Sequence, residues 1–561
     1  MIDTLKTLFW RLPKLRGIRA LQVELEQHRQ ALDQRQRELD RQGQALADKA
    51  WMLRKYQALA EGSINSAHVN SVEHTPWRHP YLSEGNIRRF RAYSEAVWRF
   101  ARVYADRRPE ALRAAFVINM AQNMYKWARM AQQQGADATL VLHPHEQTAL
   151  NMPEWEEFDG AYPDLLDGAG FLAAHPELAA RVAVPVERPQ MDGEALLMAY
   201  RRFLGGERRP LLTLLAQTPG LRYEALTTYD AIYSYYAWAA QLARFDVLYT
   251  NGPSPAAYAS GRPYCMFSFG GDLMFDAGRG DDYGRVMNLA ANAARFIPIS
   301  NPHTLGHARR LGLHNGVYLP YPMDEGRYCP GEGRARREWA AQYGGAVFAL
   351  MTTRLDAGVK GQDAGFFQAL VDVARQRPTL RFIFLAWGKG AEEFRRRVAA
   401  AGVGGQFILL PPVGKQRLID YYRSCDMVID QLVWGYYGAT ALEAAAVGQP
   451  VVMKLRSDQY RALYAEDMMP AHNVDGADAL GRALLRLSDD AALRHESGAA
   501  MRAWLLRNHG EAHTMPLLLA LLRLTADRIP LPEEIARENP LLDPLTEVEE
   551  AYHQSCLEPT S

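Results

Sequence analysis

The chain has 561 residues, which is too long for one hydrophobic core, so at least two domains are expected. Hydrophobic residues make up 48% of it and charged residues 23%, as in soluble globular proteins. Lys and Arg number 64 and so do Asp and Glu, so the net charge gives no reason to expect nucleic acid as a partner.

The cysteines and the apolar runs favour a cytoplasmic protein. No apolar run is long enough to span a bilayer, and no signal peptide is evident. No Cys-x-x-Cys pair is present, so we expect reduced thiols and no zinc site. The cysteines are Cys265, Cys329, Cys425 and Cys556.

Residues 1–62 form a separate segment with a heptad pattern. One row of the heptad is apolar, but the second row is mostly polar, so the pattern predicts a long helix with a weak or mixed coiled coil. Such a helix can form a homo-oligomer, and docking on another surface is the equal alternative. The apolar row is Ile18, Leu25, Leu32, Leu39, Leu46 and Leu53.

Ahead of the heptads, residues 5–16 mix Leu, Phe and Trp with Lys and Arg. A basic amphipathic segment suits peripheral contact with a membrane, and it suits docking on a protein nearly as well. Pro13 interrupts the pattern, which argues against one continuous helix.

Residues 63–325 show the pattern of an α/β domain with a parallel sheet. Apolar runs end in polar or Gly-rich loops, and helical segments lie between them. The loop 119–123 either offers amides to an acceptor or, as we favour, caps the helix that follows. Strands are expected at 114–119, 138–143, 245–250, 263–269 and 295–300, with a helix at 122–134.

The apolar run 347–350 is expected to be a strand that leads into a loop with two cations, Arg354 and Lys360. Fixed cations at the carboxyl end of a parallel strand can hold a pyrophosphate and stabilise its charge as it leaves. Isolated cations in loops more often face solvent, so Arg354 and Lys360 indicate a pyrophosphate site only together with the next motif.

That motif is residues 436–452, where a turn at Gly438 opens an Ala-rich helix and Gly-x-Pro ends it. An unobstructed helix N-terminus presents unpaired N–H groups to a diphosphate. Glu443, about one turn further, can accept hydrogen bonds from ribose hydroxyls. The alternative is an ordinary helix packed on a sheet, with Glu443 in solvent.

Taken in order, the motifs of residues 345–460 resemble the nucleotide-sugar domain of GT-B glycosyltransferases, in particular the large retaining family numbered four. The acceptor-side half resembles these enzymes more weakly. The matching segments are Arg354-Leu355 with Lys360-Gly361, then residues 380–390, 407–413, 418–430 and 438–452.

This resemblance implies an α/β GT-B fold, in which two Rossmann-like domains face a cleft, here with an N-terminal long helix or coiled coil added. Residues 63–325 would be the acceptor domain and residues 326–510 the nucleotide-sugar domain. Residues 511–561 would form a helix that returns to the first domain, followed by a proline-rich extended tail from 530.

The resemblance also implies roles for single residues. Arg354 and Lys360 would bind the diphosphate and act in catalysis by neutralising it as it leaves. Glu443 would hold the ribose, and Asp272 would be the nearest ionisable catalytic candidate on the acceptor side. The remaining donor contacts would come from Gly388 and Val413 beside the base and from Gly438, Ala439 and Thr440 at the helix start.

Two positions depart from the family pattern. Gly435 stands where relatives have a glutamate that touches the donor sugar, and Phe269 stands where they often have a histidine. The preceding Asp430-Gln431 resembles a bacterial variant in which Asp-Gln precedes a Gly-aromatic-aromatic-Gly turn.

The function implied is transfer of a hexosyl group, with retention, from a nucleotide diphosphate-sugar (UDP- or GDP-sugar) to a hydroxyl, without a required metal. A glycan or glycolipid acceptor in bacterial surface polysaccharide synthesis is favoured, in the cytoplasm or peripherally at the inner membrane. A protein acceptor, an inactive sugar-nucleotide or glycan-binding scaffold, and another GT-B enzyme such as an epimerase or sugar-phosphate transferase stay open. The sequence identifies neither the sugar nor the acceptor.

Overall fold

The structure is a computed structural model, and it describes residues 25–32, 35, 79–108, 110–144, 146–189, 238–239, 241–278, 282–355, 364–388 and 390–555. Of the N-terminal 62 residues, 25–32 and 35 are described, and they are helical. Leu25 and Leu32 of the heptad row are exposed on this helix. The rest of the predicted coiled coil and the basic amphipathic segment lie outside the described residues.

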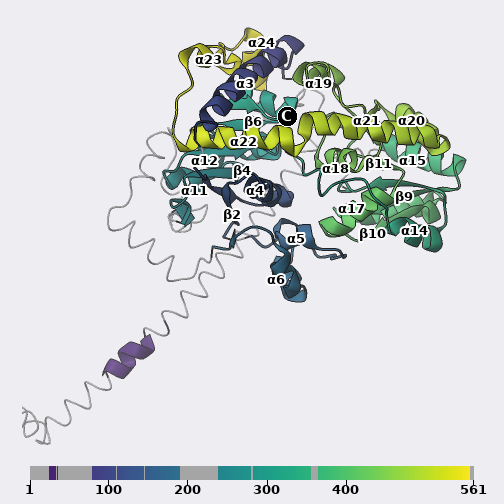
Figure 1. Cartoon of the computed structure of the whole chain (residues 1–561). Helices are drawn as coiled ribbons and strands as arrows, with labels where there is room; N and C mark the ends of the chain where they lie inside the picture. The colour runs from purple at the N-terminus through teal and green to yellow at the C-terminus, as the bar shows by residue number, and fades with distance from the viewer. Residues whose placement is uncertain are drawn as a thin grey trace, which may run out of the picture.

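Two large parallel sheets with helices around them organise the chain (Figure 1). The first has the order β3-β2-β1-β4-β5, and Met266 donates a backbone hydrogen bond to Phe296 beside the pair β6-β7. The parallel sheet predicted between residues 63 and 325 is therefore confirmed. Its strands are β1 (Arg113–Val117), β2 (Asp137–Val141), β3 (Val186–Glu187), β4 (Val247–Asn251) and β5 (Tyr264–Phe267). The strands β6 (Ile297–Ile299) and β7 (Gly316–Tyr318) form a separate parallel pair.

The second sheet is also parallel and has the order β10-β9-β8-β11-β12-β13. Its strands are short apolar runs that are mostly buried on both faces, as expected where helices cover a parallel sheet. They are β8 (Val347–Met351), β9 (Leu380–Leu385), β10 (Phe407–Leu410), β11 (Met427–Ile429), β12 (Val451–Met453) and β13 (His472–Asn473).

The Ala-rich helix predicted after Gly438 is α18 (Ala439–Val447). It ends at Gly448, whose φ of +85° is the left-handed conformation that glycine adopts without strain. Its small side chains allow close packing against α21 (Ala491–His509), where a Cβ at Gly498 would lie 2.0 Å from the Gly448 carbonyl oxygen. The alanine content of α18 therefore reflects close packing.

The strand order places a crevice in each sheet. In the first sheet the direction of chain progression reverses between β1 and β4, and in the second it reverses between β8 and β11. Ligands of doubly wound sheets bind outside the carboxyl ends of the strands at such a switch point. The loops after β1, β4, β8 and β11 are therefore the places to look for a site.

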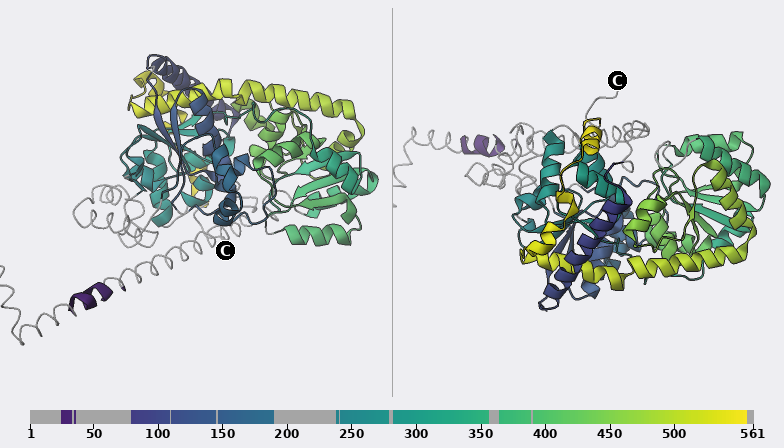
Figure 2. Two further views of the ribbon diagram at one scale, coloured as in Figure 1. Left: turned by 60° about the horizontal axis from the view of Figure 1, so that its bottom comes forward. Right: turned by 90° about the horizontal axis from the view of Figure 1, so that it is seen from above.

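A pair of helices returns the chain from the second sheet to the first. Helix α21 lies beside α18, and α22 (Glu511–Ala526) packs beside α3 (Glu84–Ala105) on the first unit (Figures 1 and 2). The two helices join at Gly510, where a Cβ would lie 2.6 Å from the Leu506 carbonyl oxygen. The domain boundaries at residues 62, 325 and 510 stay predictions.

The remaining helices cover the two sheets and the connections between them. None of the helices in the described ranges combines the length and the apolar character needed to cross a bilayer. The helices are α4 (Asn123–Gln133), α5 (Glu154–Glu157), α6 (Gly168–Ala174), α11 (Pro255–Ala259), α12 (Asp282–Ala293), α13 (Pro302–Arg310), α14 (Ala335–Tyr343), α15 (Ala364–Gln376), α16 (Ala391–Ala400), α17 (Lys415–Ser424), α19 (Ser457–Leu463) and α20 (Ala477–Asp489).

The expectation of an extended tail after residue 530 is wrong for two segments, α23 (Glu533–Arg537) and α24 (Glu547–Ser555). The tail is held by the buried guanidinium of Arg309 on α13. It donates to Glu549 Oε1 at 2.8 Å and to the carbonyl oxygen of Asp543 at 2.7 Å. Long-range contacts of this kind stabilise short helices that the proline-rich sequence does not predict.

Arg309→Ala tests this anchor. The variant leaves Glu549 buried without its cation, which typically costs about 3–5 kcal/mol. We expect a lower melting temperature and rapid proteolysis within residues 530–555. The control is Arg89→Ala, which removes an exposed pair with Asp543 of the same tail and should cost less than about 1 kcal/mol. Equal resistance of both variants to protease would contradict the anchoring role.

Candidate active site between the two sheets

The loop after β1 is held in an unusual backbone conformation. Ile118, Ala121 and Gln122 have φ of 68°, 50° and 70°, which costs free energy for residues other than glycine. Asn119 Oδ1 accepts from the backbone N–H of Tyr125 at 2.9 Å, so the predicted capping of the following helix, α4, is confirmed. Gln122 Nε2 donates to two carbonyl oxygens of the 150–152 segment. The loop is thus fixed before any ligand arrives.

Lys126, one turn into α4, is a buried cation that points toward the second unit. Its Nζ lies 3.1 Å from the Tyr321 hydroxyl and 3.9 Å from Glu443 Oε1. Burial alone lowers the pKa of Lys126, but Tyr321 and the carboxylates of Glu443 and Glu156 outweigh this effect and raise it above its usual value. Lys126 therefore stays charged.

Glu443 on α18 is the carboxylate that lies opposite the Lys126 ammonium group. It is 1% exposed, its Oε1 accepts from Lys415 Nζ at 2.6 Å, and its Oε2 accepts from the Tyr422 hydroxyl at 3.1 Å. Burial raises the pKa of Glu443, but Lys415 and Lys126 outweigh this effect and hold it below its ordinary value. Glu443 is thus a buried carboxylate bound by both units, and the alternative of a solvent-exposed side chain is wrong.

The predicted contact of Glu443 with ribose stays a prediction. Each carboxylate oxygen has two lone pairs, so each can accept one further hydrogen bond beside its present partner. A ribose hydroxyl would have to approach this carboxylate in the presence of Lys415 and Tyr422.

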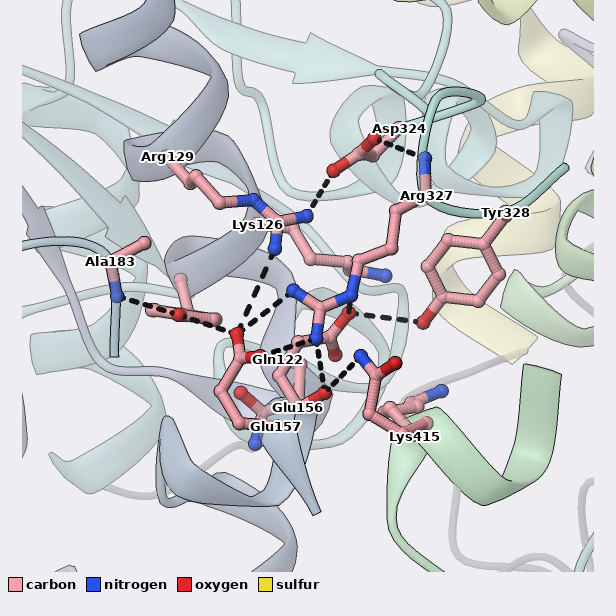
Figure 3. Close-up of polar contacts among 12 residues, drawn as sticks. Gln122, Lys126, Arg129, Glu156, Glu157, Ala183, Asp324, Arg327, Tyr328 and Lys415 are labelled. Carbon is pink, nitrogen blue, oxygen red and sulfur yellow. Dashed lines mark hydrogen bonds and ion pairs between the residues drawn. The ribbon is translucent and has the colours of Figure 1, made fainter. Parts of the chain in front are cut away.

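A second set of charges lies next to this one (Figure 3). Arg327 donates to both oxygens of Glu157 at 2.8 and 2.7 Å, and Arg129 on α4 is paired with Asp324. Figure 3 shows Arg327 pointing between Glu156 and Glu157, which belong to α5. These ion pairs connect α4, α5 and the segment that follows β7.

Of these carboxylates, Glu156 has the fewest hydrogen-bond donors and cations to replace the water that it has lost. Its Oε1 accepts from the Tyr328 hydroxyl at 3.2 Å, while its Oε2 has no hydrogen-bond partner among the residues described. Burial raises the pKa of Glu156 to about 7, even though Lys126, Lys415 and Arg129 oppose the rise. Glu156 therefore changes charge near neutral pH.

The end of β8 lies against the start of α18. The Thr352 and Thr440 hydroxyl oxygens are 3.0 Å apart, and Arg354 follows two residues after Thr352 as an exposed side chain. Its guanidinium carbon lies 5.9 Å from the Trp387 ring centroid. The predicted diphosphate residue Arg354 thus comes near the helix start, while Lys360 lies outside the described residues.

The start of α18 is open. Gly438 provides no side-chain cap, and a Cβ built there would meet no atom within 4 Å. Ala439 and Thr440 are half-buried and follow as the first two residues of the helix. The predicted amide donors therefore border open space, as an anion site requires.

The two residues predicted to border the base are placed differently. Gly388 has a φ of 96° just after β9, where Trp387 donates through its indole N–H to the Thr352 carbonyl oxygen at 2.9 Å. Val413 is buried and forms an antiparallel bridge with Ala161 of the first unit. Val413 is therefore part of a contact between the two units.

Asp272 lies in a π-helical turn after β5 and is 1% exposed. Its Oδ1 accepts from the Ser268 hydroxyl at 2.8 Å, and its Oδ2 has no hydrogen-bond partner in the part of the chain that the structure describes. Burial raises the pKa of Asp272 to about 7. Phe269, three residues earlier, is 38% exposed.

Aromatic residues connect the first unit to the turn before α18. The His303 and Tyr436 rings are stacked with centroids 3.8 Å apart, and the Tyr437 hydroxyl donates to the Ser300 carbonyl oxygen at 2.9 Å. The turn is thus supported from the first unit. Among the described residues, no group of three or more His, Cys, Asp or Glu side chains is arranged to hold a metal ion.

Sequence reasoning missed Lys126 and Lys415. Nothing local marks Lys126, because its partner is more than 300 residues away in the chain. Lys415 did carry a signal, since it is the first residue of α17, where the helix dipole disfavours a cation. A local rule broken in this way suggests a compensating partner elsewhere, which is Glu443.

Comparison with known proteins shows a similarity in the second unit. Residues 348–490 match the family described as Glycosyl transferases group 1. The match begins in β8 and includes α18, so it contains Arg354, Gly388, Val413 and Glu443. It leaves the first unit unassigned.

Two curated relatives are similar over less than half of the chain. D-inositol 3-phosphate glycosyltransferase of Pseudarthrobacter chlorophenolicus is 30% identical over 257 residues, which are 43% of this chain and 58% of that protein. The enzyme of the same name from Mycobacteroides abscessus is 29% identical over 40% of this chain and 51% of its own length. The chain thus spans little more than half the length of these relatives.

Solved structures extend the likeness to both units. Anabaena HepE, solved in complex with UDP and glucose, aligns with a TM-score of 0.50 and 13% identity over 73% of this chain and 98% of that one. The same protein with UDP-glucose also aligns with a TM-score of 0.50. The predicted GT-B fold, with two parallel-sheet units, is confirmed.

The pH dependence of stability tests the burial of Glu156. A carboxyl titrates near 4.5 when the chain is unfolded and near 7 here, so the folded protein binds the proton more tightly. The contribution of Glu156 to stability is then greatest below pH 4.5, and it falls by about 3 kcal/mol as the pH rises to 7 and above. The melting temperature of Glu156→Gln should therefore be higher than that of the unmodified protein at pH 8 and close to it at pH 5.

Glu157→Gln is the matched control for this comparison. It removes a carboxylate that is paired on both oxygens with Arg327, so its melting temperature should fall at both pH values. A fall at pH 8 for Glu156→Gln as large as that for Glu157→Gln would show that Glu156 is a charged, stabilising partner.

Proposed function

We propose that this protein is a glycosyltransferase that moves a sugar from a nucleotide diphosphate-sugar to a hydroxyl of a glycan or glycolipid. The observation that carries the proposal is the open start of α18 at the switch point between β8 and β11, with Arg354 nearby and the loop before α4 on the other unit. The match of residues 348–490 supports the same chemistry.

The donor would bind with its diphosphate at the start of α18. The backbone N–H groups of Gly438, Ala439 and Thr440 and the guanidinium of Arg354 would neutralise it, and Lys360 would add a second cation. Gly388 would border the base, and Glu443 the ribose. UDP is the first nucleotide to test, because HepE was solved with it, and GDP is the second.

The difficult step is departure of the diphosphate from an anomeric carbon with oxocarbenium character. The protein lowers this barrier by holding fixed positive charge where negative charge develops on the leaving oxygen. Arg354, Lys360 and the helix amides supply that charge. Removal of one such donor typically raises the barrier by about 2.7–4 kcal/mol.

The acceptor would enter from the side of the first unit, between the loop before α4 and the turn that carries Asp272. A carboxyl with its pKa near 7 is suited to take a proton from the acceptor hydroxyl. We infer transfer with retention of the anomeric configuration, in which the leaving diphosphate guides the acceptor onto the same face. An inverted product anomer, read by NMR, would contradict retention.

A thermal-shift and donor-hydrolysis screen tests the proposal. UDP-, GDP-, ADP- and dTDP-sugars are added to the intact protein and to Arg354→Ala. We expect one nucleotide to stabilise the intact protein by about 2.7 kcal/mol at a hundredfold excess over its Kd. Arg354→Ala should lower kcat/KM about 100- to 1,000-fold.

Arg395→Ala is the matched control, since it removes an exposed arginine of α16 in the same unit. It should change neither the stabilisation by nucleotide nor kcat/KM. Binding of no nucleotide by the intact protein would contradict the proposal and favour a glycan-binding scaffold. Epimer formation without transfer would favour a different GT-B enzyme.

A further inference from the structure

The side chain of Arg456, which follows β12, packs against the turn ahead of α18. Gly435 has a φ of +81°, and a Cβ there would lie 2.8 Å from Arg456 Cγ and 3.0 Å from Arg456 Nε. The backbone N–H of Arg456 donates to the Gly435 carbonyl oxygen at 2.9 Å. The Arg456 side chain therefore occupies the space next to Gly435, and a larger residue at position 435 would be strained by this conformation and would displace Arg456.

The turn is rigidly built. Gln431 Oε1 accepts from the backbone N–H groups of Trp434 at 2.8 Å and Gly435 at 3.2 Å. Its Nε2 donates to the carbonyl oxygens of Tyr436 at 2.5 Å and Lys454 at 3.0 Å. One buried amide thus joins the turn to the strand end that carries Arg456, which explains the glutamine of the Asp-Gln pair in the sequence.

The charges near this turn define what it can bind. Asp430 is buried at the start of the turn, and the exposed Asp475 lies 2.7 Å from Lys454 Nζ. Lys454 lowers the pKa of Asp475 through a hydrogen bond and its charge, and Arg456 contributes to the same shift. Arg456 itself is half-buried.

A guanidinium and a carboxylate select different sugars. A carboxylate accepts hydrogen bonds from neutral hydroxyls, whereas a guanidinium only donates, and it pairs best with a planar carboxylate through two parallel bonds. The turn lies three residues before Gly438, where the proposed diphosphate site begins. The group joined to that diphosphate is the donor sugar, so the sugar would meet Arg456.

We propose that the donor sugar is a uronic acid and that the guanidinium of Arg456 binds its carboxylate. This inference rests on the proposed function, because it needs the diphosphate at the start of α18. Trp434 and Tyr436, both half-buried on either side of Gly435, would border the sugar ring. Arg456 would then determine which donor is used.

The test compares paired donors by isothermal titration calorimetry. The probes are UDP-glucose with UDP-glucuronate and GDP-mannose with GDP-mannuronate, with UDP and GDP alone beside them. In the pair whose nucleotide binds, we expect the acidic sugar to bind at least about tenfold more tightly than the neutral one. In Arg456→Gln this ratio should fall to about one.

Lys454→Gln is the control variant, because it removes a neighbouring cation that is already paired with Asp475 and should leave the ratio unchanged. Binding of UDP or GDP by both variants shows that the site is folded. Equal affinity for acidic and neutral donors, or a ratio unchanged in Arg456→Gln, would overturn the inference while the proposed function stands. Binding of neither UDP nor GDP, alone or as a sugar conjugate, would overturn the inference too, and it would count against the proposed function.

Discussion

The buried carboxylate of Glu443 is the constraint on which the rest of the site depends. A carboxylate that is 1% exposed remains ionised only if cations and hydrogen-bond donors replace the water that it has lost. Those partners come from α17 in its own unit and from α4 in the other. Because the Glu443 carboxylate needs both cations, α4 and α18 are held facing each other, and the two switch points lie side by side.

The second group of ion pairs stabilises the first unit beside this contact. Arg327 and Arg129 hold the carboxylates of α5 and the segment after β7, and the bridge between Ala161 and Val413 adds backbone contact between the units. A buried charge that loses its partner is costly, so the units cannot separate far without disrupting the contact of Lys126 with Glu443. In the proposed reaction, exclusion of water from between the units would strengthen the electrostatic stabilisation of the leaving diphosphate.

Much of the fold was predictable from the sequence, because apolar runs that end in Gly-rich loops mark the strands of a parallel sheet. The same local signals predicted α18 and Arg354 at the carboxyl ends of strands. Lys126 was not predictable, since its role depends on a carboxylate brought near only by the folded chain. The helical tail was missed for the same reason, because Arg309, far away in the sequence, stabilises what its prolines disfavour locally.

Hydrogen–deuterium exchange of the intact protein, with and without saturating UDP or GDP, tests most directly whether both units form one nucleotide site. The account predicts that the nucleotide slows exchange both in peptides covering residues 434–443 and in peptides covering residues 119–126. Slower exchange in only one unit, or only at segments away from the carboxyl ends of the strands, would contradict it.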